Sequence, residues 1–282
     1  MPEAPSYYSK AEHALCVQNI SLGYEQKTIL KEISFCVDHG QIVTILGGSG
    51  SGKSTLMKGL VGLLKPAEGT VTLYGMDISG TGTEESLEWA RKRIGVLFQS
   101  GALIGSLTIA ENIALPIREL SNIPKEILPE IVRLKLEMVR LGGYGDYYPA
   151  ELSGGMKKRA GLARAMALDP QILFCDEHSS GLDPVTAAEM DQLLLELNSA
   201  LGITMVVITH DLPSIKAISD WSIMIDGDAQ GIIATGPPDE LEKSPDPRVH
   251  DFFTGGPLRG MPDEGGPRWL ERLVHSKSAS LP

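Results

Sequence analysis

The stretch that most constrains the fold of this chain is QIVTILGGSGSGKST, residues 41–55. An apolar run as long as a buried strand leads into a glycine-rich turn, in which Gly47 and Gly52 frame four residues before Lys53. Glycines let backbone N–H groups turn inward around an anion, and a following helix directs its positive end at the same phosphates. The pattern therefore predicts a nucleotide phosphate site formed by Gly47, Gly48, Ser49, Gly50, Ser51, Gly52, Lys53, Ser54 and Thr55.

A second apolar run, ILFC, ends in Asp176 and Glu177 and is followed by His178. The three residues could form a metal cluster, a hydrolytic dyad, or two working carboxylates beside a bystander. Adjacent residues of an extended segment point to opposite faces, so three in a row do not easily converge on one ion. We therefore expect Asp176, on the strand beside the phosphate site, to hold Mg²⁺ through its water shell, together with Ser54. Glu177 would accept a proton from the attacking water, and His178 would support the site or merely be tolerated.

Charge and cysteine usage limit the classes of partner. The formal net charge is −11 and the basic residues are scattered, which argues against a nucleic-acid partner. Cys16, Cys36 and Cys175 stand singly in apolar runs, so we expect no disulfide framework, no zinc site and a reducing compartment. No apolar run approaches the roughly eighteen residues of a membrane span, and no secretory signal begins the sequence. A soluble, cytoplasmic protein is expected.

Strand-like and helical segments alternate along the chain. Short β-rich runs fill the first hundred residues, a helical texture covers residues 107–168, and apolar strands return in QILFC, ITMVVIT and SIMID. Continuous apolar strands alternating with helices indicate a parallel sheet covered on both faces. The sequence therefore predicts an α/β domain that is split by a helical insertion at about 99–169.

One helix of the insertion is expected to begin at Pro124 or to restart after Pro129, and to end at 142–143. Its predicted core face consists of Ile127, Ile131, Leu134, Met138 and Leu141.

A later helix has Ser153 as a candidate N-cap, followed by Gly154 and Gly155, and an apolar stripe of Met156, Ala160, Ala163 and Ala167. A capped amphipathic helix is the simplest interpretation. The two glycines and the bare N–H groups also suit a second anion site. Because the chain already has one phosphate site, the two sites suggest a dimer.

Beyond Lys243 the composition shifts to proline and glycine, which predicts an extension with little regular structure. On composition that extension is predicted to be a mobile tail, although Trp269, Leu270, Leu273 and Val274 form a short apolar stripe within it.

Several motifs occur together: GGSGSGKST, Gln99 after an apolar strand, LSGGM, ILFCDE, GLDP and VVITHD. This set resembles the nucleotide-binding subunits of ABC transporters over residues 14 to about 245. The resemblance implies a P-loop NTPase of the ABC type. Its RecA-like core and antiparallel β subdomain would occupy 1–98 and 170–245, its inserted helical subdomain 99–169, and its C-terminal extension 246–282.

The resemblance also implies ATP hydrolysis in a head-to-tail homodimer, in which Ser153, Gly154 and Gly155 of one copy cover the ATP bound to the other. By the same resemblance Gln99 contacts Mg²⁺ and the attacking water, and Asp183 bridges the two sites. Tyr24 would stack on adenine and His210 would sense the γ-phosphate, although a strand aromatic and a strand-end cap remain open alternatives. The family normally has proline where this chain has His178, which bears on the loop leading to Asp183.

Three uses of ATP are open to such a chain. A chromosome-maintenance ATPase would need long heptad arms, and a ribosome-associated one normally has two nucleotide domains with basic linkers. The remaining class, a transporter subunit peripheral on the inner face of the cytoplasmic membrane, fits best. Within it, VLFQSGALIGSLTIAENIALPIREL and PDPRVHDFFTGG resemble the Mla/Mce type, which moves lipid between bacterial membranes. That resemblance also implies that the C-terminal extension can dock on the opposite subunit, for which the stripe of Trp269, Leu270, Leu273 and Val274 is the candidate.

The partners implied for such a subunit are a transmembrane permease, a lipid-binding Mce-type protein and a small regulatory subunit. Residues 103–116 are the candidate permease socket, with internal packing as the alternative.

Overall fold

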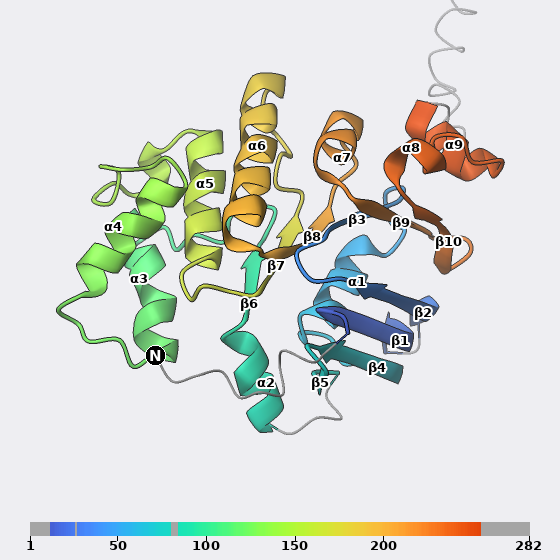
Figure 1. Ribbon diagram of the computed structural model, residues 1–282, viewed down its shortest axis with the longest axis horizontal. Helices are drawn as coiled ribbons and strands as arrows, with labels where there is room; N and C mark the ends of the chain where they lie inside the picture. The colour runs from blue at the N-terminus through green and yellow to red at the C-terminus, as the bar shows by residue number, and fades with distance from the viewer. Residues whose placement is uncertain (1–11, 26, 80–83, 255–282) are drawn as a thin grey trace, which may run out of the picture.

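The computed structural model of the protein describes residues 12–25, 27–79 and 84–254 (Figure 1). Within them, six strands form one sheet in the order β10-β9-β3-β8-β7-β6. The bounds are β3 Ile42–Leu46, β6 Ile94–Leu97, β7 Ile172–Asp176, β8 Thr204–Ile208, β9 Trp221–Asp226 and β10 Gly231–Gly236. All neighbours pair in parallel except β9 and β10.

Alternating side chains of the buried strands feed two cores on opposite faces of this sheet. Along β7, Ile172 and Phe174 pack with the helix that follows the phosphate loop, whereas Leu173 and Cys175 pack with the helices on the other face. The prediction of a parallel sheet covered on both faces is therefore confirmed. The same alternation places Asp176 on the face of the phosphate loop. The strand that carries it does not adjoin β3 as expected, because β8 lies between them.

A second, antiparallel sheet has the order β2-β1-β4-β5, with bounds β1 Leu15–Tyr24, β2 Lys27–Val37, β4 Glu68–Leu73 and β5 Met76–Asp77. Helix α1, Lys53–Leu60, contacts both β1 and β7 and so lies between the two sheets (Figure 1). Cys16 and Cys36 are partners in the β1–β2 register, and the structure joins them in a disulfide. Our prediction of unpaired cysteines was wrong here, since strand pairing brings together residues 20 positions apart. Cys175 is free and buried.

The helices between β6 and β7 gather at one end of the molecule (Figure 1). They are α3 Ile109–Leu120, α4 Leu128–Met138, the short helix η2 Pro149–Glu151, and α5 Gly154–Ala165. Their mutual core includes Ile113, Val132, Leu136 and Ala160. The exact limits of this subdomain, 99 and 169, stay a prediction.

Helix α4 begins at Leu128, between the two predicted starts, because Pro129 is accommodated in the first turn, where its missing N–H is not needed. Its predicted core face is partly wrong, because Ile127 and Leu134 are 50% and 47% exposed. The helix instead packs on α3 and α5 through Val132 and Leu136. Both stripes of α4 contain apolar residues, and periodicity alone does not say which one meets the neighbouring helices.

The remaining helices are α2 Glu84–Arg91, α6 Pro184–Leu201, α7 Leu212–Ile218, α8 Pro238–Leu241 and α9 Pro247–Thr254. Helix α9 lies where we predicted little regular structure, and that prediction was wrong for 247–254. Val249, Phe252 and Phe253 form the helix because they pack with Leu46 and Leu241 in a third core. Residues 255–282, including the predicted docking stripe, lie outside the described residues. No helix among the described residues is long and apolar enough to cross a membrane.

Candidate active site

The phosphate loop joins the central strand β3 to the N-terminus of α1. Gly47 has a φ of 149°, and a Cβ there would lie 2.3 Å from the carbonyl oxygen of Ile225. Gly52 is the N-cap of α1 with a φ of 101°, in the left-handed region that other residues rarely adopt. The glycines of the motif are therefore required by close backbone approach and by backbone conformation.

A cavity of about 730 Å³ surrounds this loop. The phosphate loop, Gln99, Asp176, Glu177 and His210 line it, and so do Asp251 and Phe252 of α9. The contribution of α9 was missed in the sequence, because nothing in PRVHDFF indicates that the helix returns to the phosphate loop.

The groups around the loop fit a nucleotide triphosphate. Gly47, Gly48, Ser49, Gly50, Gly52, Lys53, Ser54 and Thr55 all line the cavity, so their backbone N–H groups are placed to surround an anion. Nζ of Lys53 donates to the carbonyl oxygens of Gly47 and Gly48, each at 2.8 Å. Burial lowers the pKa of Lys53, while the charges of Glu177 and Asp176 act in the opposite direction. A phosphate would add compensating negative charge around this ammonium group.

Tyr24 lies at the end of β1 with 43% of its surface exposed and is not among the residues that line the cavity. Its hydroxyl accepts a hydrogen bond from Nζ of Lys58 at 3.2 Å. The same Nζ lies 5.6 Å from the centroid of the ring, and the contact of Tyr24 with adenine stays a prediction.

The three predicted catalytic residues meet at the edge of the cavity. Nε2 of Gln99 donates to Oε2 of Glu177 across 2.8 Å, and Nδ1 of His210 lies 3.2 Å from Oε1 of the same carboxylate. Two partners from separate segments therefore orient one carboxylate towards the phosphate loop. This geometry suits a general base whose position is fixed before the substrate binds.

Asp176 has the environment of a magnesium ligand. Burial raises the pKa of its carboxyl group, as does the neighbouring charge of Glu177, while Lys53 and Lys158 oppose the shift. Ser54 and Gln99 line the same cavity, and oxygen donors of this kind suit Mg²⁺. No group of three or more His, Cys, Asp or Glu side chains that could hold a metal occurs in the described part of the chain. These few protein donors fit a Mg²⁺ ion whose remaining ligands would be phosphate oxygens and water.

Lys158 of α5 is a contributor that sequence reasoning missed. Only 7% of its surface is exposed, and its Nζ donates to the carbonyl oxygens of Gln99 and Glu177 at 2.5 and 2.7 Å. Burial lowers the pKa of this lysine. The lysine ties together the two backbone segments whose side chains form the Gln99–Glu177 hydrogen bond. The run MKKR does not show which of its basic residues faces inward.

The signature residues lie apart from this cavity. Ser153 caps α5, as predicted, by accepting a hydrogen bond from the Met156 N–H at 3.3 Å. Gly155 is required within the chain, because a Cβ there would lie 2.5 Å from Cγ2 of Thr186. Neither residue lines the cavity around the phosphate loop of its own chain, and Gly154 does not either.

Asp183 caps α6, accepting from the N–H groups of Val185 and Thr186 at 3.1 Å each. The hydrogen bonds from Thr186 lower the pKa of Asp183. Its bridging role in a dimer stays a prediction.

These features define a class. The class is the ATP-hydrolysing ATP-binding cassette. Such a cassette has a phosphate loop on a buried central strand and two carboxylates at the end of another strand, here β7. It also has a capped signature helix on an inserted helical unit. The sequence model described as "ABC transporter" matches residues 30–180. The chain belongs to the ABC transporter family.

Relatives resemble the chain along most of its length. It is 40% identical over 240 residues to the intermembrane phospholipid transport system ATP-binding protein MlaF of Escherichia coli K12, covering 85% of this chain and 88% of that protein. It is 38% identical over 254 residues to the probable ribonucleotide transport ATP-binding protein mkl of Mycobacterium leprae, covering 89% and 72%.

Among solved structures, a dimer of the ATP-binding cassette MJ0796 in a post-hydrolysis state with ADP and Pi has a TM-score of 0.72. Its identity is 30%, and the match covers 79% of this chain and 98% of that one. CbiO1 of Clostridium perfringens, part of the transporter complex cbiONQ, has a TM-score of 0.74 at 25% identity, with coverage of 95% and 99%.

Proposed function

We propose that this ATPase dimerises around two ATP molecules and drives a separate membrane subunit that moves phospholipid or another lipid between membranes. The lipid assignment is supported by the 40% identity to MlaF over 85% of the chain. A second candidate is transport of another solute, since the mkl relative carries a ribonucleotide transport name at 38% identity.

The dimer proposal is carried by one observation. Gln99 and His210 each contact Glu177 within the single chain, whereas the signature residues Ser153, Gly154 and Gly155 do not line the cavity. A second copy placed head to tail would bring its signature residues to the phosphate cavity, and Asp183 would then lie at the junction. The dimeric state of the MJ0796 cassette supports this arrangement.

Within the composite site, each group has a chemical role. The loop N–H groups and Lys53 would bind the phosphates, and Mg²⁺ held through Ser54, Gln99 and Asp176 would neutralise charge on them. Glu177 would take the proton of the attacking water. Gln99 and His210 would keep that carboxylate oriented, and His210 would also contact the γ-phosphate.

The Glu177→Gln variant tests this site. It should bind ATP with unchanged affinity and accumulate as a dimer, because the base is lost while the phosphate loop is intact. Size-exclusion chromatography with ATP and Mg²⁺ would show the dimer, and a Lys53→Ala variant that binds ATP poorly is the control that should stay monomeric. A Glu177→Gln protein that hydrolyses ATP at the parent rate would refute the assignment.

The candidate permease socket, residues 103–116, combines buried and accessible side chains. Within 103–116, Ile109 and Ile113 are buried in the core, so the internal-packing alternative holds for them. A groove of about 500 Å³ nevertheless opens between α3 and α4. Its apolar floor consists of Ala110, Ala114, Leu128, Val132 and Leu136. We propose that this groove receives a short amphipathic helix of the membrane subunit.

Cargo can be tested on the complex that co-purifies with a tagged chain from detergent-solubilised membranes. The complex is reconstituted in liposomes, and ATP-dependent movement of a fluorescent phospholipid is compared with uptake of a labelled ribonucleotide. The Glu177→Gln complex is the matched control for both measurements. Ribonucleotide uptake without phospholipid movement would reject the lipid assignment. A lipid-binding Mce-type protein and a small regulatory subunit are the further components expected in the co-purified material.

A further inference from the structure

His178, the residue that directly follows Glu177, is the centre of a buried polar network. Its Nε2 donates to Oδ1 of Asp191 across 2.6 Å, and Oγ of Ser214 donates to the same oxygen. Oγ of Ser214 also lies 3.3 Å from Nε2 of His178. The exposed fractions of His178, Asp191 and Ser214 are 0%, 5% and 0%. These three residues are called the His178 network below.

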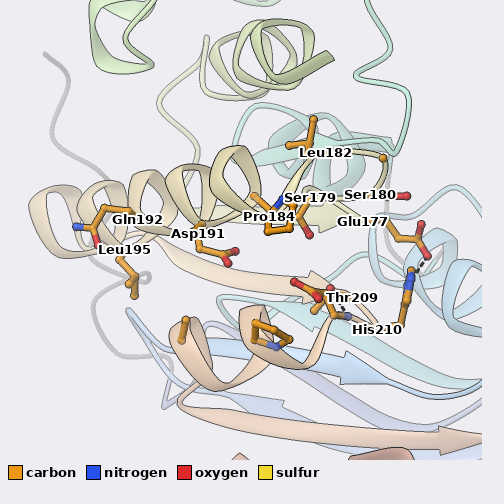
Figure 2. A pocket seen from close by; sticks show the side chains of 16 residues that line it. Glu177, Ser179, Ser180, Leu182, Pro184, Asp191, Gln192, Leu195, Thr209 and His210 are labelled. Carbon is orange, nitrogen blue, oxygen red and sulfur yellow. Dashed lines mark hydrogen bonds and ion pairs between the residues drawn. The ribbon is translucent and has the colours of Figure 1, made fainter. Parts of the chain in front are cut away.

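The network connects three segments of the active site. His178 continues the segment of Glu177, Asp191 lies on α6, whose N-cap is Asp183, and Ser214 lies on α7, just after His210. Figure 2 shows Asp191 pointing from α6 into the space between that helix and the segment that carries Thr209 and His210. The carboxylate of Asp191 on α6 thus holds the residues that follow Glu177 and His210, namely His178 and Ser214, against one helix.

Glu177 has a backbone conformation that needs such support. Its φ is 50°, in the left-handed region, which is unfavourable for a non-glycine residue and persists only where the surroundings fix it. The N–H of Glu177 donates to the carbonyl oxygen of Ile208 at 2.9 Å, and its carbonyl oxygen accepts from Lys158 at 2.7 Å. On the C-terminal side, the side chain of His178 is the anchor.

A proline at position 178 could not serve in this way. A proline ring has no N–H group to donate to Oδ1 of Asp191, so this buried carboxylate would keep only the hydrogen bond from Ser214. The histidine is therefore not a neutral replacement for the proline that is usual in the family.

We propose that His178 is a positioning residue, which holds Glu177 in its productive orientation by bonding to Asp191 and Ser214. This inference rests on the proposed role of Glu177 as the base. It assigns no contact between His178 and ATP.

A solely structural role is the competing explanation, because breaking a buried polar pair also destabilises a fold. The two explanations differ in what the folded protein does. A structural role lowers the melting temperature and leaves kcat per folded molecule unchanged. A positioning role lowers kcat at an unchanged KM for ATP and lets the ATP-bound dimer accumulate.

The experiment compares full-length parent, His178→Gln, His178→Ala, His178→Pro and the double variant His178→Leu/Asp191→Leu. Turnover of Mg-ATP, KM, melting temperature and the dimer fraction with ATP are measured for each. His178→Gln keeps a donor for Asp191 and should stay within about threefold of the parent kcat. His178→Ala and His178→Pro should lose about 10- to 100-fold in kcat with KM changed less than twofold, because a small displacement of a catalytic group has effects of this size.

The double variant keeps the test decisive even if the single variants fold poorly. Apolar residues of similar volume remove the buried charge and should restore the melting temperature, yet we expect kcat to stay low. Parent-like turnover by the double variant would overturn the proposal.

Glu177→Gln is run in the same series to separate the two levels of inference. If it hydrolyses ATP at the parent rate, the assignment of the base fails. If it is inactive while the His178 variants turn over normally, only the positioning role fails.

Discussion

Replacing Lys158 with methionine tests whether one buried ammonium group assembles the catalytic cluster. Methionine has nearly the same length and keeps the packing, but it donates to neither carbonyl. The carbonyl oxygen of Glu177 would retain the N–H of Ser180, at 3.2 Å, whereas that of Gln99 would lose the hydrogen bond from Lys158. We therefore expect the Gln99 segment to move, and with it the Gln99–Glu177 hydrogen bond.

The energetic cost follows from these contacts. A hydrogen bond from a charged donor contributes about 1.5–3 kcal/mol. Both hydrogen bonds from Lys158 are lost. The loss is partly offset, because the Glu177 carbonyl keeps the Ser180 N–H and the buried ammonium charge is removed. We expect the free energy of unfolding to fall by about 1–2 kcal/mol, which for a chain of this size lowers the melting temperature by about 2–8 °C.

Activity should fall further than stability. We expect kcat to drop about tenfold or more, because the base and the residue that orients it lose their shared support. KM for ATP should stay within about twofold, since the phosphate loop is untouched. Steady-state hydrolysis and differential scanning fluorimetry measure the two effects.

Lys157→Met is the matched control for this variant, with the same change of charge one position earlier on α5, at a half-buried residue. It should behave like the parent in both measurements. If Lys158→Met shows a lowered melting temperature and parent-like kcat, the lysine only stabilises the fold and the reasoning is refuted.

Three further predictions concern other parts of the chain. Burial raises the pKa of Asp176 in the folded protein. Between the usual carboxyl pKa and this raised pKa, the folded state binds more protons than the unfolded state, so the free energy of unfolding falls as the pH rises. Without nucleotide and Mg²⁺, Asp176→Asn should therefore melt above the parent at pH 7, with the difference vanishing near about pH 4, while hydrolysis is lost. Gly155→Ala should cost about 1–3 kcal/mol in chemical denaturation through the clash with Thr186, and Thr186→Ser, which removes the clashing methyl group, should recover most of it. Ala114→Asp, in the groove between α3 and α4, should abolish transport by the reconstituted complex and spare ATP hydrolysis, and equal losses of both would reject the groove as the socket. Leu103→Asp should instead lower the melting temperature, because Leu103 packs on the core.

Local patterns in the sequence predicted the phosphate loop and the sheet well. The conformation of residues 47–55 depends on glycines and a following helix that are adjacent in sequence, so the motif carries its own geometry. The cap at Ser153 was predictable for the same reason, because the Met156 N–H that donates to its hydroxyl is only three residues away.

Features that depend on which surfaces meet were not predictable. The exposed face of α4, the pairing of Cys16 with Cys36 and the return of α9 to the nucleotide cavity all depend on tertiary packing. The His178 network joins a turn residue to Asp191 and Ser214, which lie 13 and 36 positions further along the chain on two helices. Asp191 and Ser214 belong to no recognisable motif. Only the fold reveals that both side chains contact His178, the residue that follows Glu177.

The wall that α9 contributes to the nucleotide cavity has a consequence for shortened versions of this protein. Leu46, the last residue before the phosphate loop, shares a cluster with Val249 and Phe253. A protein ending before Pro247 would leave Leu46 and Met224 uncovered directly behind the loop. Truncation would then weaken ATP affinity before it caused general unfolding, because the exposed side chains lie behind the phosphate loop.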